Sequence, residues 1–151
     1  MLQRIQTIYL IIAGLCMSFT LYFSFATYTV NGKKIPFNSQ GFTPFGENLE
    51  SFPLYIIVLI SSILIAFSIM SFKNRKRQTF LNTANYLVII ALLVLVFASF
   101  NAFEKTVEVV KDDVSYGAGM FFPITSLVML FMANRAVKKD EELIKSMDRI
   151  R

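Results

Sequence analysis

The stretch YLVIIALLVLVFASF, residues 86–100, decides the class of fold. A helix on the surface of a soluble protein needs a polar face that recurs about every 3.6 residues, and this stretch offers none. A helix built from it must therefore be surrounded by apolar material on all sides. Lipid is the favoured surrounding, and a soluble bundle that buries the helix is the alternative.

Three further apolar segments lie on either side of this stretch. Together the four segments cover residues 8–28, 53–72, 86–103 and 117–133, and none contains Asp, Glu, Lys or Arg. Each is close to the ~20 residues that a helix needs to cross a bilayer. The chain is 55% hydrophobic and only 17% charged, which departs from the average soluble domain. We therefore predict one domain over residues 1–151, an all-α membrane protein whose four transmembrane helices form a bundle.

The first apolar segment also has some features of a secretory signal. Ser24-Phe25-Ala26 has the small-x-small form that a signal peptidase cuts after, and Arg4 would supply the charged start. However, the segment is longer than the core of a typical signal peptide, and aromatic residues crowd the cleavage position. We expect an uncleaved membrane anchor, in which the single cysteine, Cys16, is a packing residue.

The positive charges predict the orientation of the four spans. Eleven of the 15 Lys and Arg residues lie in the N-terminal flank, the connection between the second and third spans, and the C-terminal tail. Short loops rich in Lys and Arg stay in the cytoplasm. Both termini are therefore expected on the cytoplasmic side.

The same rule accounts for the cluster KNRKR at residues 73–77 without any ligand. Contact with anionic lipid headgroups or with a protein partner is an additional role that basic residues at this surface can have. Nucleic acid is disfavoured as a partner, because no aromatic residues that would stack on bases are interleaved with the charges. The predicted cytoplasmic basic surface comprises Lys73, Arg75, Lys76, Arg77, Arg135, Lys138 and Lys139.

The first extracytoplasmic connection is predicted to hold a small β-hairpin. Asn31-Gly32 suits a two-residue turn with positive φ, and β-prone residues flank it on both sides. In the second connection, TVEVV at residues 106–110 either adds a third strand or extends the third helix. The helix is slightly favoured, because Glu108 and Lys111 would pair at helical spacing. The loop residues Phe37, Phe42, Phe45 and Phe52 are expected to dip toward the membrane interface.

Residues 134–151 form a cytoplasmic tail with the pattern of an amphipathic helix. Leu143, Ile144, Met147 and Ile150 make its apolar stripe. The helix is expected to lie on the inner leaflet or pack within the chain. Alternatively, it docks on the basic cluster or on a partner through Asp140, Glu141 and Glu142.

Small residues recur along the third span and predict a seam where another helix can approach closely. The seam comprises Ala84, Ala91, Ala98 and Ala102. Its partner is either a helix of the same bundle or a helix of a larger complex. Gly117 and Gly119, just before Pro123, are expected to permit the turn into the last span.

The sequence carries no recognisable catalytic constellation. It has no histidine, which removes the commonest general base and metal ligand. It also has no phosphate-binding glycine loop and no paired-cysteine motif. We therefore expect no catalytic residues, no cofactor and no metal, and an enzyme would have to rely on loop carboxylates such as Glu47 or Asp112.

Four segments carry a resemblance to a known family. They are MLQRIQTIYL at residues 1–10, FKNRKRQ at 72–78, FFP at 121–123 and NRAVKKDEELIKSMDRIR at 134–151. They resemble a family of short, four-span inner-membrane proteins of Bacteroidota that carries only a domain-of-unknown-function label. The resemblance covers the whole chain and implies a bacterial inner-membrane location, but it supplies no activity.

These features favour a non-enzymatic protein that acts by packing. The expected function is that of an accessory or scaffold subunit of a larger membrane complex, whose partners are a membrane protein and a bilayer with anionic headgroups. The alternative is a small membrane protein that binds or carries lipid or another hydrophobic ligand. An enzyme that acts on lipid substrates ranks third.

Overall fold

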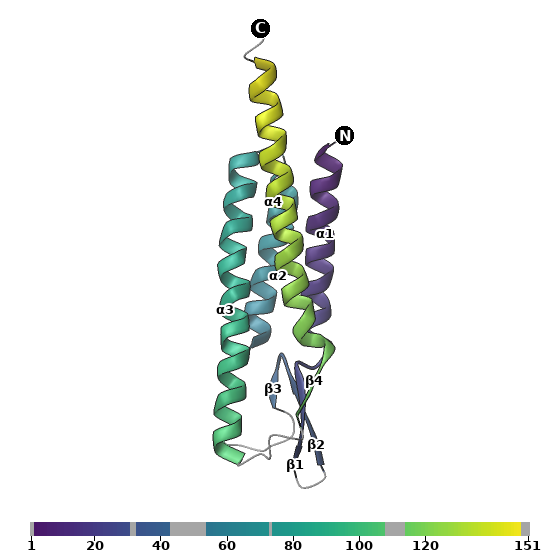
Figure 1. The fold of residues 1–151 in the computed structure, drawn as a ribbon, viewed down its shortest axis with the longest axis vertical. Helices are drawn as coiled ribbons and strands as arrows, with labels where there is room; N and C mark the ends of the chain where they lie inside the picture. Colours follow the sequence, from purple (N-terminus) through teal and green to yellow (C-terminus); the bar gives the residue numbers. More distant parts are fainter. Residues whose placement is uncertain (1, 31–32, 43–53, 73, 108–113, 149–151) are drawn as a thin grey trace.

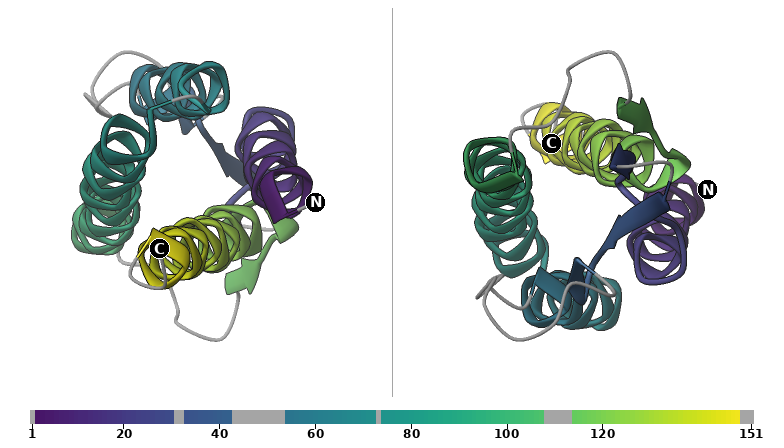
Figure 2. Two further views of the ribbon diagram at one scale, coloured as in Figure 1. Left: turned by 90° about the horizontal axis from the view of Figure 1, so that it is seen from above. Right: turned by 90° about the horizontal axis from the view of Figure 1, so that it is seen from below.

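Four helices run side by side, and a small sheet lies at one end of them (Figure 1). The computed structural model describes residues 2–30, 33–42, 54–72, 74–107 and 114–148. The helices are α1 (Leu2–Thr20), α2 (Leu54–Met70), α3 (Arg75–Val107) and α4 (Phe121–Asp148), and a short 3₁₀ helix, η2 (Ala118–Met120), precedes α4. Seen along the bundle, each helix neighbours the next one in the chain, and α4 closes the ring against α1 (Figure 2).

The sheet is antiparallel and larger than the predicted hairpin. Its strands are β1 (Ala26–Val30), β2 (Lys33–Asn38), β3 (Gly41–Phe42) and β4 (Val114–Tyr116), in the spatial order β3-β2-β1-β4. The β1–β2 hairpin is confirmed, with Tyr28 opposite Ile35. The Asn31-Gly32 turn itself lies outside the described residues.

The second connection contributes both a helix extension and a strand. Helix α3 continues to Val107, which is the alternative that the sequence slightly favoured over a strand at residues 106–110. The strand that this connection does add, β4, comes later and pairs with β1, placing Tyr28 opposite Val114. Residues 108–113 lie outside the described part of the chain.

The first helix is shorter at its C-terminal end than the predicted span of residues 8–28. It ends at Thr20, where Leu21 and Tyr22 donate backbone hydrogen bonds to carbonyls three residues back, a tightening typical of a helix end. The next residues enter the sheet, and the Phe25 N–H donates to the Phe37 carbonyl at 2.8 Å. Residues 26–28, which the predicted span included, therefore follow their strand propensity as part of β1.

The third helix begins eleven residues before the predicted span, so Arg75, Lys76 and Arg77 of the basic cluster are helical. Asn74 caps the helix, because its side-chain Oδ1 accepts a hydrogen bond from the Arg77 N–H at 3.2 Å. Arg75, Lys76 and Arg77 consequently form the first turn of α3. The predicted fourth span and the tail are likewise one helix, since α4 runs unbroken to Asp148.

An aromatic cluster packs the sheet against the C-terminal end of α3. Tyr28 and Phe37 are buried, and the ring of Phe42 stacks on Phe103 with centroids 4.1 Å apart. Phe37, which was predicted to dip toward the membrane interface, is instead buried beneath the sheet, and Phe42 is half-buried with its ring on Phe103. Phe45 and Phe52 lie outside the described residues.

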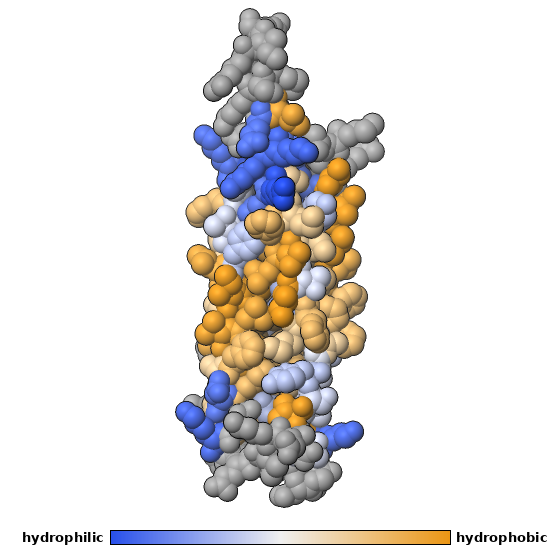
Figure 3. All heavy atoms as spheres, in the orientation of Figure 1, coloured by the Kyte–Doolittle hydropathy of each residue, from blue (hydrophilic) through white to orange (hydrophobic). Residues whose placement is uncertain are grey.

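The outward faces of the helices are apolar. Figure 3 shows a hydrophobic belt between two hydrophilic ends, and large side chains such as Leu87 and Phe131 are 68% and 62% exposed. Within the described residues, two helical stretches are long and apolar enough to cross a membrane, Arg75–Phe103 and Ala118–Asp140. Only 28% of the apolar window of each is buried, whereas the core helix of a soluble protein is mostly buried. The apolar parts of the other two helices, Ile5–Thr20 and Leu54–Met70, are shorter.

Candidate functional site

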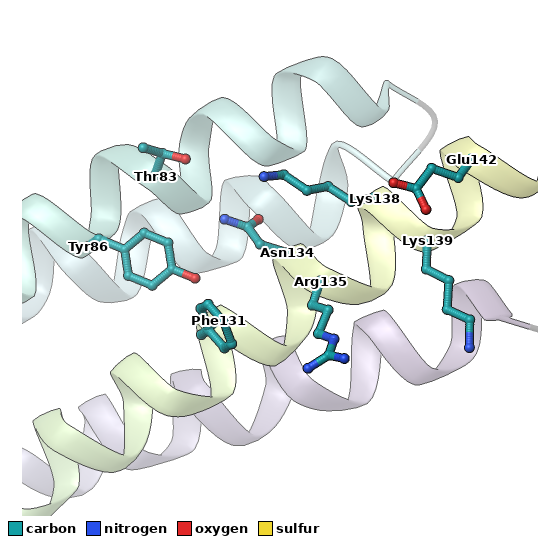
Figure 4. A pocket seen from close by; sticks show the side chains of 8 residues that line it. All are labelled: Thr83, Tyr86, Phe131, Asn134, Arg135, Lys138, Lys139 and Glu142. Atoms are coloured by element: carbon teal, nitrogen blue, oxygen red, sulfur yellow. The ribbon is translucent and has the colours of Figure 1, made fainter. Parts of the chain in front are cut away.

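A groove of about 730 Å³ opens between α3 and α4 near the end of the bundle where the N-terminus lies (Figure 4). It exists because α4 packs closely against α1 and much less closely against α3. The lining residues come from two faces, Thr83 and Tyr86 of α3 and Phe131, Asn134, Arg135, Lys138, Lys139 and Glu142 of α4.

The mouth of the groove is cationic. Arg135, Lys138 and Lys139 are exposed and follow the spacing that groups side chains on one side of a helix. Figure 4 shows Lys138 reaching toward α3, while Arg135 and Lys139 reach away from it. One carboxylate, Glu142, lies among the three cations. The local charge therefore suits an anion.

The end of the groove nearer the sheet is aromatic and partly polar (Figure 4). Phe131 and Tyr86 supply apolar surface, and the Tyr86 hydroxyl points toward the α4 side of the groove (Figure 4). That hydroxyl is buried, and it interacts with the side chain of Asn134. Together with the Asn134 amide it offers a ligand hydrogen-bonding groups below the cationic mouth.

A buried chain of hydrogen bonds lies behind the groove. The Ser68 hydroxyl donates to Asn82 Oδ1 at 2.6 Å, and Asn82 Nδ2 donates to Asn134 Oδ1 at 2.8 Å. Asn82 is fully buried and thus joins α2, α3 and α4. Asn82 and Asn85 precede the predicted span of residues 86–103, but both are buried inside the bundle, because α3 begins before them.

A second buried contact links α1 to α4. Gln6 Nε2 donates to Asp140 Oδ2 at 2.6 Å, and both side chains are buried. Asp140 therefore faces α1, contrary to the alternative in which it docks on the basic cluster. Glu142 of the same predicted acidic group lines the groove, and nothing is described for the side chain of Glu141.

The predicted basic surface falls into two groups at the same end of the bundle. Arg135, Lys138 and Lys139 line the groove, whereas Arg75, Lys76 and Arg77 lie on the first turn of α3 outside it. Lys73 lies outside the described residues. Sequence reasoning missed Tyr86, Phe131 and Asn134. The only available signal was a set of polar residues on one face of an otherwise apolar helix, namely Gln78, Asn82 and Asn85.

The predicted alanine seam faces away from the bundle for most of its length. Ala84 is half-buried, but Ala91, Ala98 and Ala102 are exposed. The side of α3 that packs inside the bundle carries larger residues, Ile89, Leu92 and Val96. The seam therefore offers its small residues to the surroundings and not to the other three helices.

Comparison with known proteins identifies a family but no activity. A family model described as a domain of unknown function (DUF4293) matches residues 2–150. A search of curated proteins and a search of solved structures each found no match. In the described part of the chain, no group of three or more acidic, histidine or cysteine side chains could hold a metal ion. Because the family model spans almost the whole sequence, the chain belongs to the DUF4293 family.

Proposed function

We propose that this chain is a non-enzymatic, four-span protein of the bacterial inner membrane, with both termini in the cytoplasm, that holds an anionic lipid between α3 and α4. The membrane assignment is supported by the outward apolar faces of all four helices, including exposed Ile8 and Leu15 on α1 and Ile56 and Ile63 on α2. Helix α2 has 17 residues and rises about 25 Å, at the lower limit for a spanning helix.

One observation carries the lipid assignment. A single groove of about 730 Å³ combines three exposed cations with an aromatic wall. A phospholipid has the matching chemistry, since its phosphate pairs with Arg and Lys and its acyl chains pack on apolar surface. A soluble anion would leave Phe131 uncovered, and a neutral hydrophobic molecule would leave the cations without a partner.

Native mass spectrometry of the protein purified in mild detergent tests this proposal. We expect a bound anionic phospholipid that is lost from a variant carrying Arg135→Gln, Lys138→Gln and Lys139→Gln. The matched control removes the same charge outside the groove, by Arg75→Gln, Lys76→Gln and Arg77→Gln, and should keep the lipid. Equal loss of the lipid from both variants would show that general surface charge holds it, and would contradict the groove as the binding site.

The accessory-subunit role remains a second candidate, and the exposed alanines favour it. Ala91 and Ala98 lie on the outer face of α3, where small residues let the backbone of a partner helix approach. If this role is correct, a stoichiometric membrane partner copurifies, is lost on Ala91→Leu and is retained on Val94→Leu, because the exposed Val94 on the same face is already large. Retention of the partner in both variants would contradict contact through the seam.

A further inference from the structure

Polar side chains from all four helices meet inside the half of the bundle that carries the termini. Each of them is buried except Asn134, which is half-buried. The set comprises Gln6 of α1, Ser61 and Ser68 of α2, Gln78, Asn82 and Asn85 of α3, and Asn134 and Asp140 of α4. The hydrogen bonds described above satisfy only part of this set.

Several of the buried polar atoms have no hydrogen-bond partner among the described residues. They are Ser61 Oγ, Gln78 Oε1, both amide atoms of Asn85, and Asp140 Oδ1. Asn85 is 1% exposed and Ser61 is 0% exposed. Buried polar groups in folded proteins almost always have a partner, and an amide that loses water without replacement costs several kcal/mol in an apolar medium. A cluster of this kind therefore calls for a polar occupant.

Helix geometry places these groups at successive levels along the bundle. The Ser68–Asn82–Asn134 hydrogen bonds fix one level of the bundle. At about 1.5 Å per residue, Gln78 lies about 6 Å and Asp140 about 9 Å from that level toward the termini. In the opposite direction, Asn85 lies about 4.5 Å and Ser61 about 10 Å away. The line thus covers about 20 Å, which is just under four helical turns.

The line stops at Ser61. One turn further along α2 is Val58, and the neighbouring positions of α3 are Leu92 and Val96, all fully buried. From there to the sheet the buried side chains are mostly apolar and aromatic, and the buried hydroxyls of Ser126 and Thr20 are bonded to helix carbonyls. The unpartnered polar atoms therefore lie toward only one end of the bundle. At their side they meet the groove, because Asn134 belongs to both the polar set and the groove lining.

We propose that this line is a water-filled crevice that enters from the end carrying the termini and ends at Ser61. Water fits because the unpartnered atoms include both acceptors, such as Gln78 Oε1, and a donor, Asn85 Nδ2, and a bound water both donates and accepts in about three hydrogen bonds. An anion would find mainly oxygen atoms. The crevice gives small polar solutes a path halfway through the bundle, independently of any lipid in the groove.

Cysteine accessibility in detergent tests the crevice. In a Cys16→Ser background, Ser61→Cys replaces the serine hydroxyl with a thiol of nearly the same shape at the closed end of the proposed crevice. Silver ions, which are small and need water to travel, should block this thiol against later alkylation at least tenfold faster than they block Val58→Cys or Leu92→Cys. These controls are equally buried but lie beyond the line. Blocking of all three at the same slow rate would overturn the proposal.

The melting temperature of Asn85→Leu supplies a second test that does not depend on a reagent. If water satisfies the Asn85 amide, leucine removes those hydrogen bonds and the variant melts at a lower temperature than the parent. If the site is dry, leucine removes an unsatisfied amide and the variant melts at a higher temperature. A higher melting temperature would overturn the crevice even if the labelling result were positive.

Discussion

At the scale of single residues, Asn82 has the strongest predicted effect on stability. Its amide accepts from Ser68 and donates to Asn134 inside the bundle, so Asn82→Leu leaves two polar groups without their partner. We expect the free energy of unfolding to fall by about 1–2 kcal/mol, measured by denaturation in detergent. Asn101→Leu is the control, because among the described residues exposed Asn101 bonds only the Phe97 carbonyl of its own helix. Equal effects of the two substitutions would contradict the cross-helix role.

Two glycines differ in how much room a side chain would have at their positions. A Cβ on Gly119 would lie 2.5 Å from the Phe23 carbonyl oxygen, a backbone atom that cannot move aside, whereas a Cβ on Gly14 would lie 3.4 Å from the side chain of Ile65. Gly119→Ala should therefore separate α4 from the end of α1 and lower the melting temperature. Gly14→Ala, in the middle of a helix, should leave it unchanged or raise it. The reverse order of melting temperatures would contradict the close approach.

At the scale of elements, Phe103 is the residue that anchors the sheet to α3. Its ring is fully buried and stacks on Phe42. Phe103→Ala should cost about 3–5 kcal/mol, and limited proteolysis should cut the sheet faster than in the parent protein. Phe97→Ala is the control, because Phe97 lies on the same helix but is 47% exposed. Unchanged proteolysis of Phe103→Ala would show that the sheet is held by other contacts.

The elements also mark the limit of what local sequence patterns could predict. The β1–β2 hairpin was predictable because Asn31-Gly32 and its β-prone flanks act over a few residues. Strand β4 was not, since it is three residues long and its only described pairing is with β1, which lies nearly 90 residues earlier. The end of α1 at Thr20 was missed for a related reason. Apolar character alone does not distinguish a spanning helix from a strand that packs against one.

At the scale of the whole molecule, the sequence predicted that basic residues share one end of the bundle, but not that three of them line a groove. The groove depends on how tightly α4 packs against each neighbour, and that is a property of tertiary contacts. Tyr86 and Asn134 line it because helices distant in the sequence converge. Their individual patterns indicate only a spanning helix and its end.

The number of spans is a property of the whole chain, and chemical labelling at the positions of two lysines can measure it. Lys34 on β2 and Lys76 at the start of α3 are both exposed. With four spans they lie on opposite sides of the membrane. If only α3 and α4 cross, no span separates them and they lie on the same side.

In a Cys16→Ser background, an impermeant maleimide applied to spheroplasts should label Lys34→Cys at once but Lys76→Cys only after permeabilisation. The positive charges predict this sidedness, because the basic end of the bundle stays in the cytoplasm. Labelling of both cysteines under the same condition would indicate that the chain has two spans and not four.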